Sequence, residues 1–590
     1  MLLAPFAALL SLQTPHAAPR IPVFVWKRGD TPSALQREFG GAVLMRNEPA
    51  EPWTREQLDT FVFNAPGRND LHLEREDARY RERWTRWLES RDERWLVREP
   101  CLTDPATIER LERTLDQALV QRGTRADRGV SLGDEIGLTP GGAPEDVCLS
   151  STCRAAWTKW WKAEFGTLAP ALESVSTDAT LRALHDGDTQ PIGAWLARRR
   201  FHQEVLLELV ARLARRVRAF DSRTPVGLLG LAGQSAFGGV AVERVLPQLD
   251  FIECYRVGNA RELAFTTRRP EQSVWATAFC EARGPAASAH AVWDHWMRGG
   301  DGFVIWSEDE LERAPEHARA LLEAVRGVRQ IDAEWSGYRP APRGVAIVHR
   351  PRDVAAQWLR DALLDGSTWP KRFQSWQETH GTLESARKRW IDAAEEQAAM
   401  PGALPSSAIS AATVARFPLL VLVQALVVDD VEIAALRSYV QAGGRLCIDG
   451  EFAWIDGTGR KHSEEQRQRW LTELAPVAPP EGFATLVEGV ARRDATRAWW
   501  DARAVDRAPW LVSGAGAEHW TWSATWSERG DVVQGVLLPR VAATPWPDQV
   551  ELAARSGWRL AWTRPERDEH GRIACEPGSP ILLVLERNQR

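Results

Sequence analysis

The chain has 590 residues, with 74 Lys or Arg against 80 Asp or Glu, for a formal net charge of −6. Its length allows several domains, and 44% hydrophobic with 26% charged residues excludes a mainly disordered chain. The acidic balance argues against a nucleic-acid partner, which needs a basic face. Seven cysteines are too few to be a disulfide scaffold for a chain of this length.

The N-terminus is typical of an export signal. Leu2–Leu12 form an apolar run, and Ala17 or Ala18 offers a cleavage point, so residues 1–18 are predicted to be a signal peptide. A buried first strand is the alternative. No later segment has the roughly 20 apolar residues that a membrane span requires. We therefore expect a secreted or periplasmic protein without a membrane span.

From residue 19 to residue 335, short apolar strands alternate with amphipathic helices, such as Asp104–Arg122, Cys153–Glu164 and Phe201–Phe220. This alternation predicts an α/β fold, with a (β/α)8 TIM barrel as the leading choice. A TIM barrel has eight strands, so one of nine candidates must be spurious or accessory. The candidates are Val23–Trp26, Ala42–Arg46, Phe61–Asn64, Trp95–Arg98, Gly129–Gly133, Pro225–Leu231, Phe251–Tyr255, Val274–Cys280 and Phe303–Trp306.

A second domain is predicted over residues 344–475, after the linker-like segment Ser336–Gly344. Its strands and helix follow one another in the order typical of a flavodoxin-like, doubly wound domain. The predicted elements are the strands Val345–His349, Leu419–Val423 and Leu446–Asp449 and the helix Val431–Ala442.

A third domain is predicted over residues 484–590. The Pro-rich break at 476–480 separates it from the second domain. Short alternating strands rich in Trp follow to the end of the sequence, and they predict a small C-terminal β-sandwich.

Two glutamates follow predicted barrel strands directly. Asp134 and Glu135 come after the strand Gly129–Gly133, and Glu281 comes after Val274–Cys280. Active sites of TIM barrels are built at the carboxyl ends of the strands. Glycoside hydrolysis needs two carboxyl groups there, one as acid and one as nucleophile. Carboxylates also end strands for structural reasons, so the spacing alone leaves both interpretations open.

The segment around Glu135 resembles the acid/base region of family 42 β-galactosidases, which belong to clan A of the glycoside hydrolases. In that family a strand ending in Asn-Glu precedes a Cys-x-Cys-x-x-Cys loop and a helix of the type AAFRxWLKxxYGTLxAL. Here Asp134-Glu135 precedes Cys148, Ser150 and Cys153 at that spacing, and then RAAWTKWWKAEFGTL. The resemblance implies a retaining β-glycosidase with Glu135 as general acid/base and Glu281 as nucleophile.

The resemblance extends over residues 21–454. The phrases LLVLVQALVVDD and YVQAGGRLCIDGE resemble the family's trimerisation domain. The resemblance therefore implies a carbohydrate substrate and a trimer as the candidate homo-oligomer.

Two departures from the family pattern leave the substrate open. Asp134 replaces the family's Asn, and an ionised carboxylate can only accept hydrogen bonds. The family's Trp shortly after the nucleophile is missing behind Glu281. Another β-glycoside, such as a mannoside, glucuronide or arabinoside, is one alternative to a galactoside. A non-catalytic carbohydrate-binding protein on a degenerate glycosidase barrel is the other.

Further residues are predicted to contact the sugar. Tryptophans at strand ends can stack on a sugar ring at the barrel rim. Some of the other candidate residues are implied by the resemblance. Arg46 and Asn47 are predicted to lie at the same rim as the tryptophans. The predicted substrate-binding residues are Asp134, Arg98, Tyr255, Trp306, Trp26 and Asn64.

Three cysteines stand where members of the family hold a structural zinc with four thiolates. Cys101, Cys148 and Cys153 are present, but Ser150 takes the place of one loop cysteine. Tetrahedral zinc normally takes four ligands. A zinc site, free thiols and a disulfide are therefore all open alternatives for these three cysteines. The predicted hydrolysis requires no cofactor.

Overall fold

The computed structural model describes most of the chain from residue 21 onward. The described residues are 21–26, 29–67, 70–74, 77–122, 129–231, 233–255, 260–335, 338–366, 368, 382–396, 400–483, 496, 499, 510–513, 520–526, 532–539, 549–554, 558–566, 568, 572–575 and 579–587. The predicted signal peptide, residues 1–18, lies outside them.

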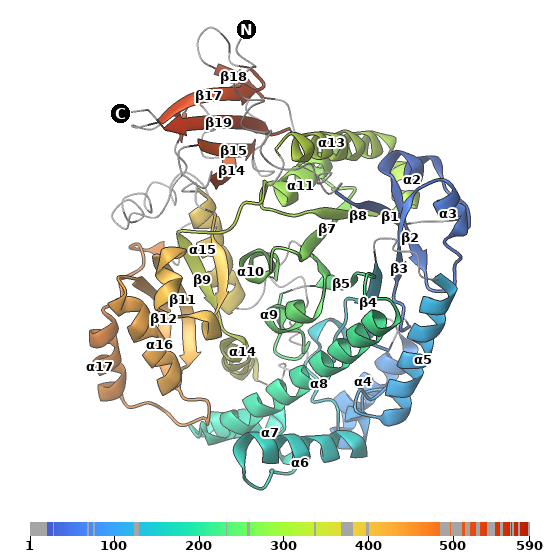
Figure 1. Ribbon diagram of the computed structural model, residues 1–590. Coiled ribbons are helices and arrows are strands. Elements are labelled where there is room, and N and C mark those ends of the chain that lie inside the picture. Colours follow the sequence, from blue (N-terminus) through green and yellow to red (C-terminus); the bar gives the residue numbers. More distant parts are fainter. Residues whose placement is uncertain are drawn as a thin grey trace.

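Eight parallel strands close into a barrel, with each strand hydrogen-bonded to its neighbours in sequence and β8 returning to β1 (Figure 1). The TIM-barrel prediction is thereby confirmed. The strands are β1 (Val23–Trp26), β2 (Gly41–Met45), β3 (Asp59–Phe63), β4 (Val130–Asp134), β5 (Val226–Leu231), β6 (Phe251–Cys254), β7 (Ser273–Phe279) and β8 (Gly302–Trp306).

The ninth candidate strand, Trp95–Arg98, is wrong. The chain instead forms a 3-10 turn over Glu93–Leu96. Asp92 caps the start of this turn, because its side chain accepts a hydrogen bond from the backbone N–H of Arg94. This capping satisfies a backbone donor locally, so the segment does not need a sheet partner. Leu96 of this turn belongs to the same apolar cluster as Val147 and Leu149, which follow β4.

Helices form the outer layer of the barrel, where their apolar faces cover the strands. The long helix α8 begins at Gln190 rather than at the predicted Phe201, because Pro191 in its first turn suits a helix start. The helices are α2 (Ala34–Phe39), α3 (Glu51–Arg55), α4 (Ala78–Ser90), α5 (Pro105–Arg122), α6 (Ser151–Phe165), α7 (Thr177–His185), α8 (Gln190–Phe220), α9 (Val242–Val245), α10 (Ala260–Thr267), α11 (Pro285–Met297), α12 (Glu308–Arg313) and α13 (Pro315–Glu334).

Large side chains fill the barrel interior. Phe251 of β6 stacks on Trp275 of β7 with ring centroids 4.1 Å apart, and Phe24 of β1 meets Phe61 of β3 edge to face at 4.8 Å. Side chains alternate between the two faces of a strand, so every second residue continues this column toward the carboxyl ends. The barrel interior is therefore a packed core. Only the layer of residues between these rings and the carboxyl ends of the strands faces the mouth of the barrel.

The second domain is a four-stranded parallel sheet in the order β10-β9-β11-β12. The predicted strands are present, and the structure adds β10, which the sequence interpretation missed. Its elements are β9 (Val345–His349), α14 (Pro351–Asp365), α15 (Thr382–Glu396), β10 (Gly402–Pro405), β11 (Leu419–Val427), α16 (Asp430–Gln441), β12 (Arg445–Ile455) and α17 (Glu464–Leu474). Helix α14 contacts α7 and α8 of the barrel.

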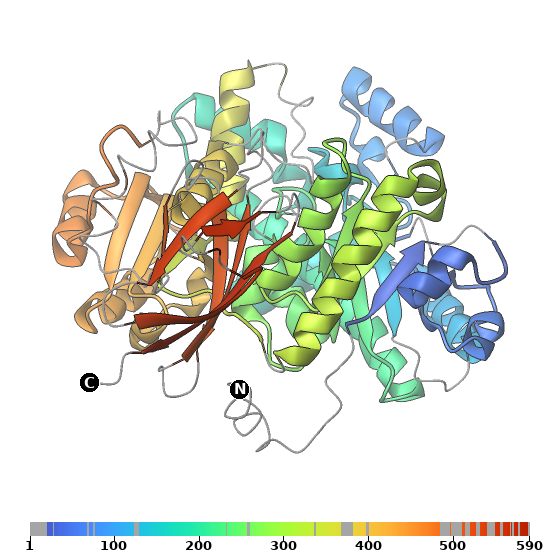
Figure 2. The same cartoon turned by 90° about the horizontal axis from the view of Figure 1, so that it is seen from above.

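The C-terminal strands form two antiparallel sheets, of three and four strands. In Figures 1 and 2 these red strands lie beside α11 and α13 of the barrel. The strands are β13 (Trp510–Ser513), β14 (Trp520–Trp526), β15 (Val532–Pro539), β16 (Gln549–Ala554), β17 (Trp558–Arg564), β18 (Arg572–Ala574) and β19 (Ile581–Arg587). In the part of the chain that the structure describes, no helix has both the length and the apolar composition that a membrane crossing requires.

Candidate active site

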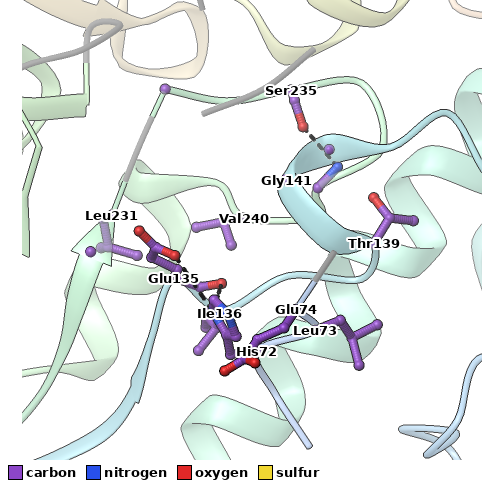
Figure 3. Close-up of a pocket in the computed structure, with 14 residues that line it drawn as sticks. His72, Leu73, Glu74, Glu135, Ile136, Thr139, Gly141, Leu231, Ser235 and Val240 are labelled. Carbon is purple, nitrogen blue, oxygen red and sulfur yellow. Dashed lines mark hydrogen bonds and ion pairs between the residues drawn. The ribbon is translucent and has the colours of Figure 1, made fainter. Parts of the chain in front are cut away.

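A cavity of about 270 Å³ opens at the carboxyl ends of β4 and β5 (Figure 3). Three loops enclose it, one after each of the strands β3, β4 and β5, as expected for the functional end of a TIM barrel. We call it the β4–β5 pocket. It is lined by His72, Leu73, Glu74, Glu135, Ile136, Thr139, Gly141, Gly142, Gly230, Leu231, Gly233, Ser235, Gly238 and Val240.

Glu135 lies in this pocket, directly after β4. Its backbone has φ = +46°, in the left-handed region that costs a non-glycine residue about 1–2 kcal/mol. The Tyr255 hydroxyl donates a hydrogen bond of 2.8 Å to Glu135 Oε1. Burial raises the pKa of Tyr255 well above its usual range, so the phenol keeps the proton that it donates. The carboxyl group is thus held in one orientation by its backbone and by Tyr255.

Gly230, at the end of β5, makes room for this arrangement. It has φ = +64°, and a Cβ atom placed on it would lie 2.4 Å from Asp134 Oδ1 and 2.8 Å from Glu135 Cγ. Those separations are shorter than a van der Waals contact permits. Only glycine therefore lets β5 approach the Asp134–Glu135 pair this closely.

His72, in the loop after β3, lies beside Glu135 (Figure 3). Its Nδ1 lies 3.1 Å from the carbonyl oxygen of Asp134 and 3.2 Å from that of Glu135. Because carbonyl oxygens only accept, Nδ1 carries the proton. The same nitrogen is 3.7 Å from Glu135 Oε2. The sequence interpretation missed His72, although a loop that follows a barrel strand is where such residues occur.

A second missed carboxyl group lies next to the pocket. Glu253 of β6 is 1% exposed, and its Oε2 accepts a 2.6 Å hydrogen bond from the Gly230 N–H. Its Oε1 accepts one of 2.8 Å from the N–H of Thr277 on β7. Burial raises the pKa of Glu253 to about 7. Glu253 thus links the ends of β5 and β7 on either side of its own strand.

Aromatic rings occupy the other part of the barrel mouth. Trp26 of β1 contacts Phe63 of β3 at 4.3 Å and Trp306 of β8 at 5.0 Å, measured between ring centroids. We call these three residues the aromatic rim. Trp306 is 39% exposed, and Phe279, its register partner on β7, is 37% exposed. Exposed rings at this position can stack on the apolar face of a sugar.

Glu281 follows β7 by two residues and is half-buried. Trp275 points into the barrel, so Phe279 and Glu281 have the parity of the inward-facing residues. The backbone N–H of Glu281 donates a 2.9 Å hydrogen bond to Ser288 Oγ of α11. This bond fixes the position at which the chain leaves β7.

The remaining predicted sugar contacts lie in different environments. Asp134 ends β4 beside Glu135, and Asn64 follows β3, is 4% exposed and has φ = +48°. Arg46 and Asn47 follow β2 and do not line the β4–β5 pocket.

Arg98 departs from its predicted role in substrate binding. It is 1% exposed, and its guanidinium donates to the carbonyl oxygens of Asp70, Gly137 and Leu138 at 2.8–3.0 Å. These bonds occupy the donors that a sugar would need. Arg98 instead fixes the backbone of the loops after β3 and β4.

The cysteines Cys101, Cys148 and Cys153 lie close enough for their thiols to interact, yet none of the seven cysteines, all of them among the described residues, forms a disulfide. Cys101 Sγ lies 3.0 Å from Ser150 Oγ, a hydroxyl at the position of the missing thiol. Among the described residues, no group of three or more His, Cys, Asp or Glu side chains is arranged to hold a metal ion. No disulfide links any two of these three cysteines in the structure.

No family model matches the chain, and no curated protein matches it in sequence. Solved structures do match it in fold. A catalytic mutant of Gan42B, a GH42 β-galactosidase from G. stearothermophilus, is 11% identical, with a TM-score of 0.67 over 97% of this chain and 99% of that one. A β-galactosidase from Bacillus circulans sp. alkalophilus is 10% identical, with a TM-score of 0.65 over 97% and 100%.

A GH42 exo-carrageenase from Bacteroides ovatus has the same fold. It is 10% identical, with a TM-score of 0.60 over 98% of this chain and 83% of that one. At such low identity the likeness concerns the fold alone, but it extends over nearly the whole length of the two β-galactosidases as well as over this chain. From the barrel to the C-terminal sheets, the chain has the fold of the GH42 β-galactosidases.

Proposed function

We propose that the protein is a retaining β-glycosidase that hydrolyses terminal β-linked sugars. The observation that carries the proposal is the placement of Glu135, held by Tyr255 and lining a pocket at the carboxyl end of β4. The chain has the fold of GH42 β-galactosidases, and a second carboxyl group, that of Glu281, follows β7 at the same end of the barrel.

In the proposed mechanism Glu135 protonates the glycosidic oxygen while Glu281 attacks the anomeric carbon. The bond to the leaving group breaks, and a glycosyl–Glu281 ester forms. Glu135, now a carboxylate, then removes a proton from water, which attacks the ester and releases the sugar with retained configuration. The Tyr255 hydroxyl stabilises the carboxylate form of Glu135 by donating to Oε1. Retention requires the two carboxyl groups to be about 5–5.5 Å apart in the working enzyme.

Export, a carbohydrate substrate with no nucleic-acid partner, and a homotrimeric assembly are part of the same proposal. The apolar run Leu2–Leu12 supports export, and the resemblance of the second domain to the family's trimerisation domain supports the trimer. Fractionation of cells that express the full chain, and light scattering of the purified protein, test these two points separately.

The test of activity is a panel of aryl β-glycosides, including galactoside, mannoside, glucuronide and arabinoside. At least one should be hydrolysed, and Glu281→Gln should lower kcat by more than about 10³-fold without lowering the melting temperature. Glu271→Gln is the matched control, because Glu271 is an exposed carboxylate just before β7, at the opposite end of the barrel. Full turnover by Glu281→Gln would remove Glu281 from the mechanism.

Azide separates the two proposed roles. With Glu281→Gly, azide should restore cleavage of an activated aryl glycoside and give a glycosyl azide of inverted configuration. With Glu135→Gly, the azide product should keep the configuration of the substrate, because azide attacks the glycosyl–enzyme intermediate. The same product configuration from both variants would contradict the assignment.

The alternative is a carbohydrate-binding protein on a barrel that no longer catalyses. Asp134 in place of the family's Asn favours it. It predicts that wild-type protein binds an oligosaccharide in calorimetry while hydrolysing none of the panel.

A further inference from the structure

One wall of the β4–β5 pocket is formed by residues 233–240, which follow β5 and which we call the β5 loop. Gly233, Ser235 and Gly238 of this loop line the pocket. Inside the loop, the Gly238 N–H donates a 2.8 Å hydrogen bond to Ser235 Oγ. A segment with three glycines among eight residues has little conformational preference of its own, so its shape depends on what holds it from outside.

Two other side chains of the β5 loop, Gln234 and Phe237, contact the second domain. Gln234 is 5% exposed, and its Oε1 lies 2.7 Å from Nε2 of His349, which is 1% exposed. His349 is the last residue of β9, so it belongs to the second domain. Burial lowers the pKa of His349 well below its usual value, so the ring is neutral. The contact is thus a buried hydrogen bond that crosses from one domain to the other.

An aromatic contact holds the loop at its other end. The ring of Phe237 lies 4.8 Å from Trp358 of α14 and 6.0 Å from Trp195 of α8, measured between centroids. Phe237 therefore packs between one tryptophan of the second domain and one of the barrel. Its carbonyl oxygen accepts a 3.4 Å hydrogen bond from the hydroxyl of Thr139, itself a pocket-lining residue.

We propose that the second domain determines the shape of the pocket, with His349 and Trp358 as positioning residues for the β5 loop. They act through Gln234 and Phe237, which alternate along the loop with residues that line the pocket. The link to substrate affinity rests on the proposed glycosidase function, whereas the anchoring of the loop does not.

The test compares His349→Ala, Gln234→Ala and the double variant by hydrogen exchange of the full-length protein. Peptides that cover residues 233–241 should exchange about 5-fold faster in each variant, the factor expected for losing one hydrogen bond of about 1 kcal/mol. The double variant should exchange no faster than either single variant, because both remove the same bond. His349→Gln, which keeps a donor near the position of Nε2, should restore slow exchange.

Kinetics on the best aryl glycoside give a second readout. KM should rise about 5-fold in His349→Ala, with kcat within about 2-fold of wild type, because the change affects a wall of the pocket rather than Glu135. His295→Ala is the matched control. His295 is equally buried and bonds the carbonyl oxygen of Val274 at 2.9 Å, so its loss lowers stability without touching the β5 loop.

Two results would overturn the proposal. One is wild-type exchange of the β5 loop in both His349→Ala and Gln234→Ala. The other is equal acceleration in His295→Ala, which would mean general loosening of the fold. If the wild-type protein hydrolyses no glycoside but its β5 loop still responds to His349→Ala, the glycosidase proposal fails and the anchoring stands. If the protein is an active glycosidase but its β5 loop does not respond to His349→Ala, the glycosidase proposal stands and the anchoring fails.

Discussion

The mouth of the barrel has two unlike sides. Toward β4–β6, the side chains are polar and each is fixed by directed contacts, as when Tyr255 bonds Glu135 and Glu253 bonds the N–H of Gly230. Toward β8, β1 and β3, the aromatic rim is held by ring packing between Trp26, Phe63 and Trp306. A hydrogen bond fixes the distance between donor and acceptor to within a few tenths of an ångström and also restricts its angle, whereas contacts between rings tolerate small rotations.

This difference implies a division of labour. A group that transfers a proton must be placed accurately, and the polar side provides that accuracy at the cost of a strained backbone at Glu135. A surface that stacks on a sugar needs area and shape rather than exact direction. Substitutions on the polar side should therefore lower kcat, and those on the aromatic rim should raise KM.

The largest effect is expected from Gly230→Ala. The new methyl group would lie within 2.4 Å of Asp134 Oδ1, so the Asp134–Glu135 segment must move, and kcat/KM should fall by about 100-fold or more. Steady-state kinetics on the best aryl glycoside measure it. Gly166→Ala is the control, since Gly166 has φ = +68° and nothing within 4 Å of the added Cβ. Similar losses in both variants would mean that backbone strain, rather than the displaced carboxyl groups, is responsible.

Glu253 should make the stability of the polar side depend on pH. Its pKa is raised from 4.5 to about 7, so the folded state holds this proton more tightly than the unfolded chain. The resulting stabilisation is complete below pH 4.5 and is lost as the pH rises through 7, up to about 3 kcal/mol. Denaturant unfolding between pH 5 and pH 8 should show a steeper fall of stability with pH in the wild type than in Glu253→Gln, which keeps only the slope from other groups such as buried Asp301.

A control from the barrel interior sharpens that measurement. Phe24→Leu, in an apolar part of the core, should lower the free energy of unfolding by the same amount at every pH. Equal pH slopes in wild type and Glu253→Gln would show that Glu253 does not change its protonation on unfolding.

Trp306→Ala tests the aromatic rim. Removing an exposed ring that can stack on a sugar should raise KM by about 10-fold and change kcat by less than about 3-fold. Trp306→Phe should recover most of the affinity. Trp160→Ala serves as the control, because Trp160 packs on Phe201 outside the barrel mouth. A fall in kcat with constant KM in Trp306→Ala would contradict the division between the two sides.

The smallest effect is expected from Tyr255→Phe. Losing one hydrogen bond to Glu135 should lower kcat by about 5- to 10-fold and leave KM within about 2-fold. Steady-state kinetics on the best aryl glycoside measure both constants. Tyr439→Phe removes a buried hydroxyl that bonds the Phe417 carbonyl in the second domain, and it should change stability but not kcat.

The sequence was most informative about the barrel strands. All eight were among the nine candidates, because a buried parallel strand is a short apolar run between turn residues. The error at Trp95–Arg98 has a local cause, since Asp92 caps a 3-10 turn there. The predicted carboxyl ends of these strands allowed four residues to be placed at the mouth of the barrel: Glu135, Tyr255, Trp26 and Trp306.

The partners of those residues could not be predicted. His72 and Glu253 act through backbone groups of other strands, and such contacts exist only once the barrel has closed. Arg98 misled the sequence interpretation because a resemblance to a family motif does not reveal burial. His349 contacts Gln234, 115 residues away in sequence, and no local pattern marks that pair.

The C-terminal sheet affects how the chain can be made. Val536, Leu538, Leu582 and Val584 belong to the same apolar cluster as Val292 of α11 and Val325 of α13. A ribosome that adds about 5–20 residues per second needs roughly 13–50 s to go from Val325 to Leu582. During that interval the β7–β8 sector, which carries Glu281 and Trp306, has an uncovered apolar flank, and it is complete only when the last strand emerges.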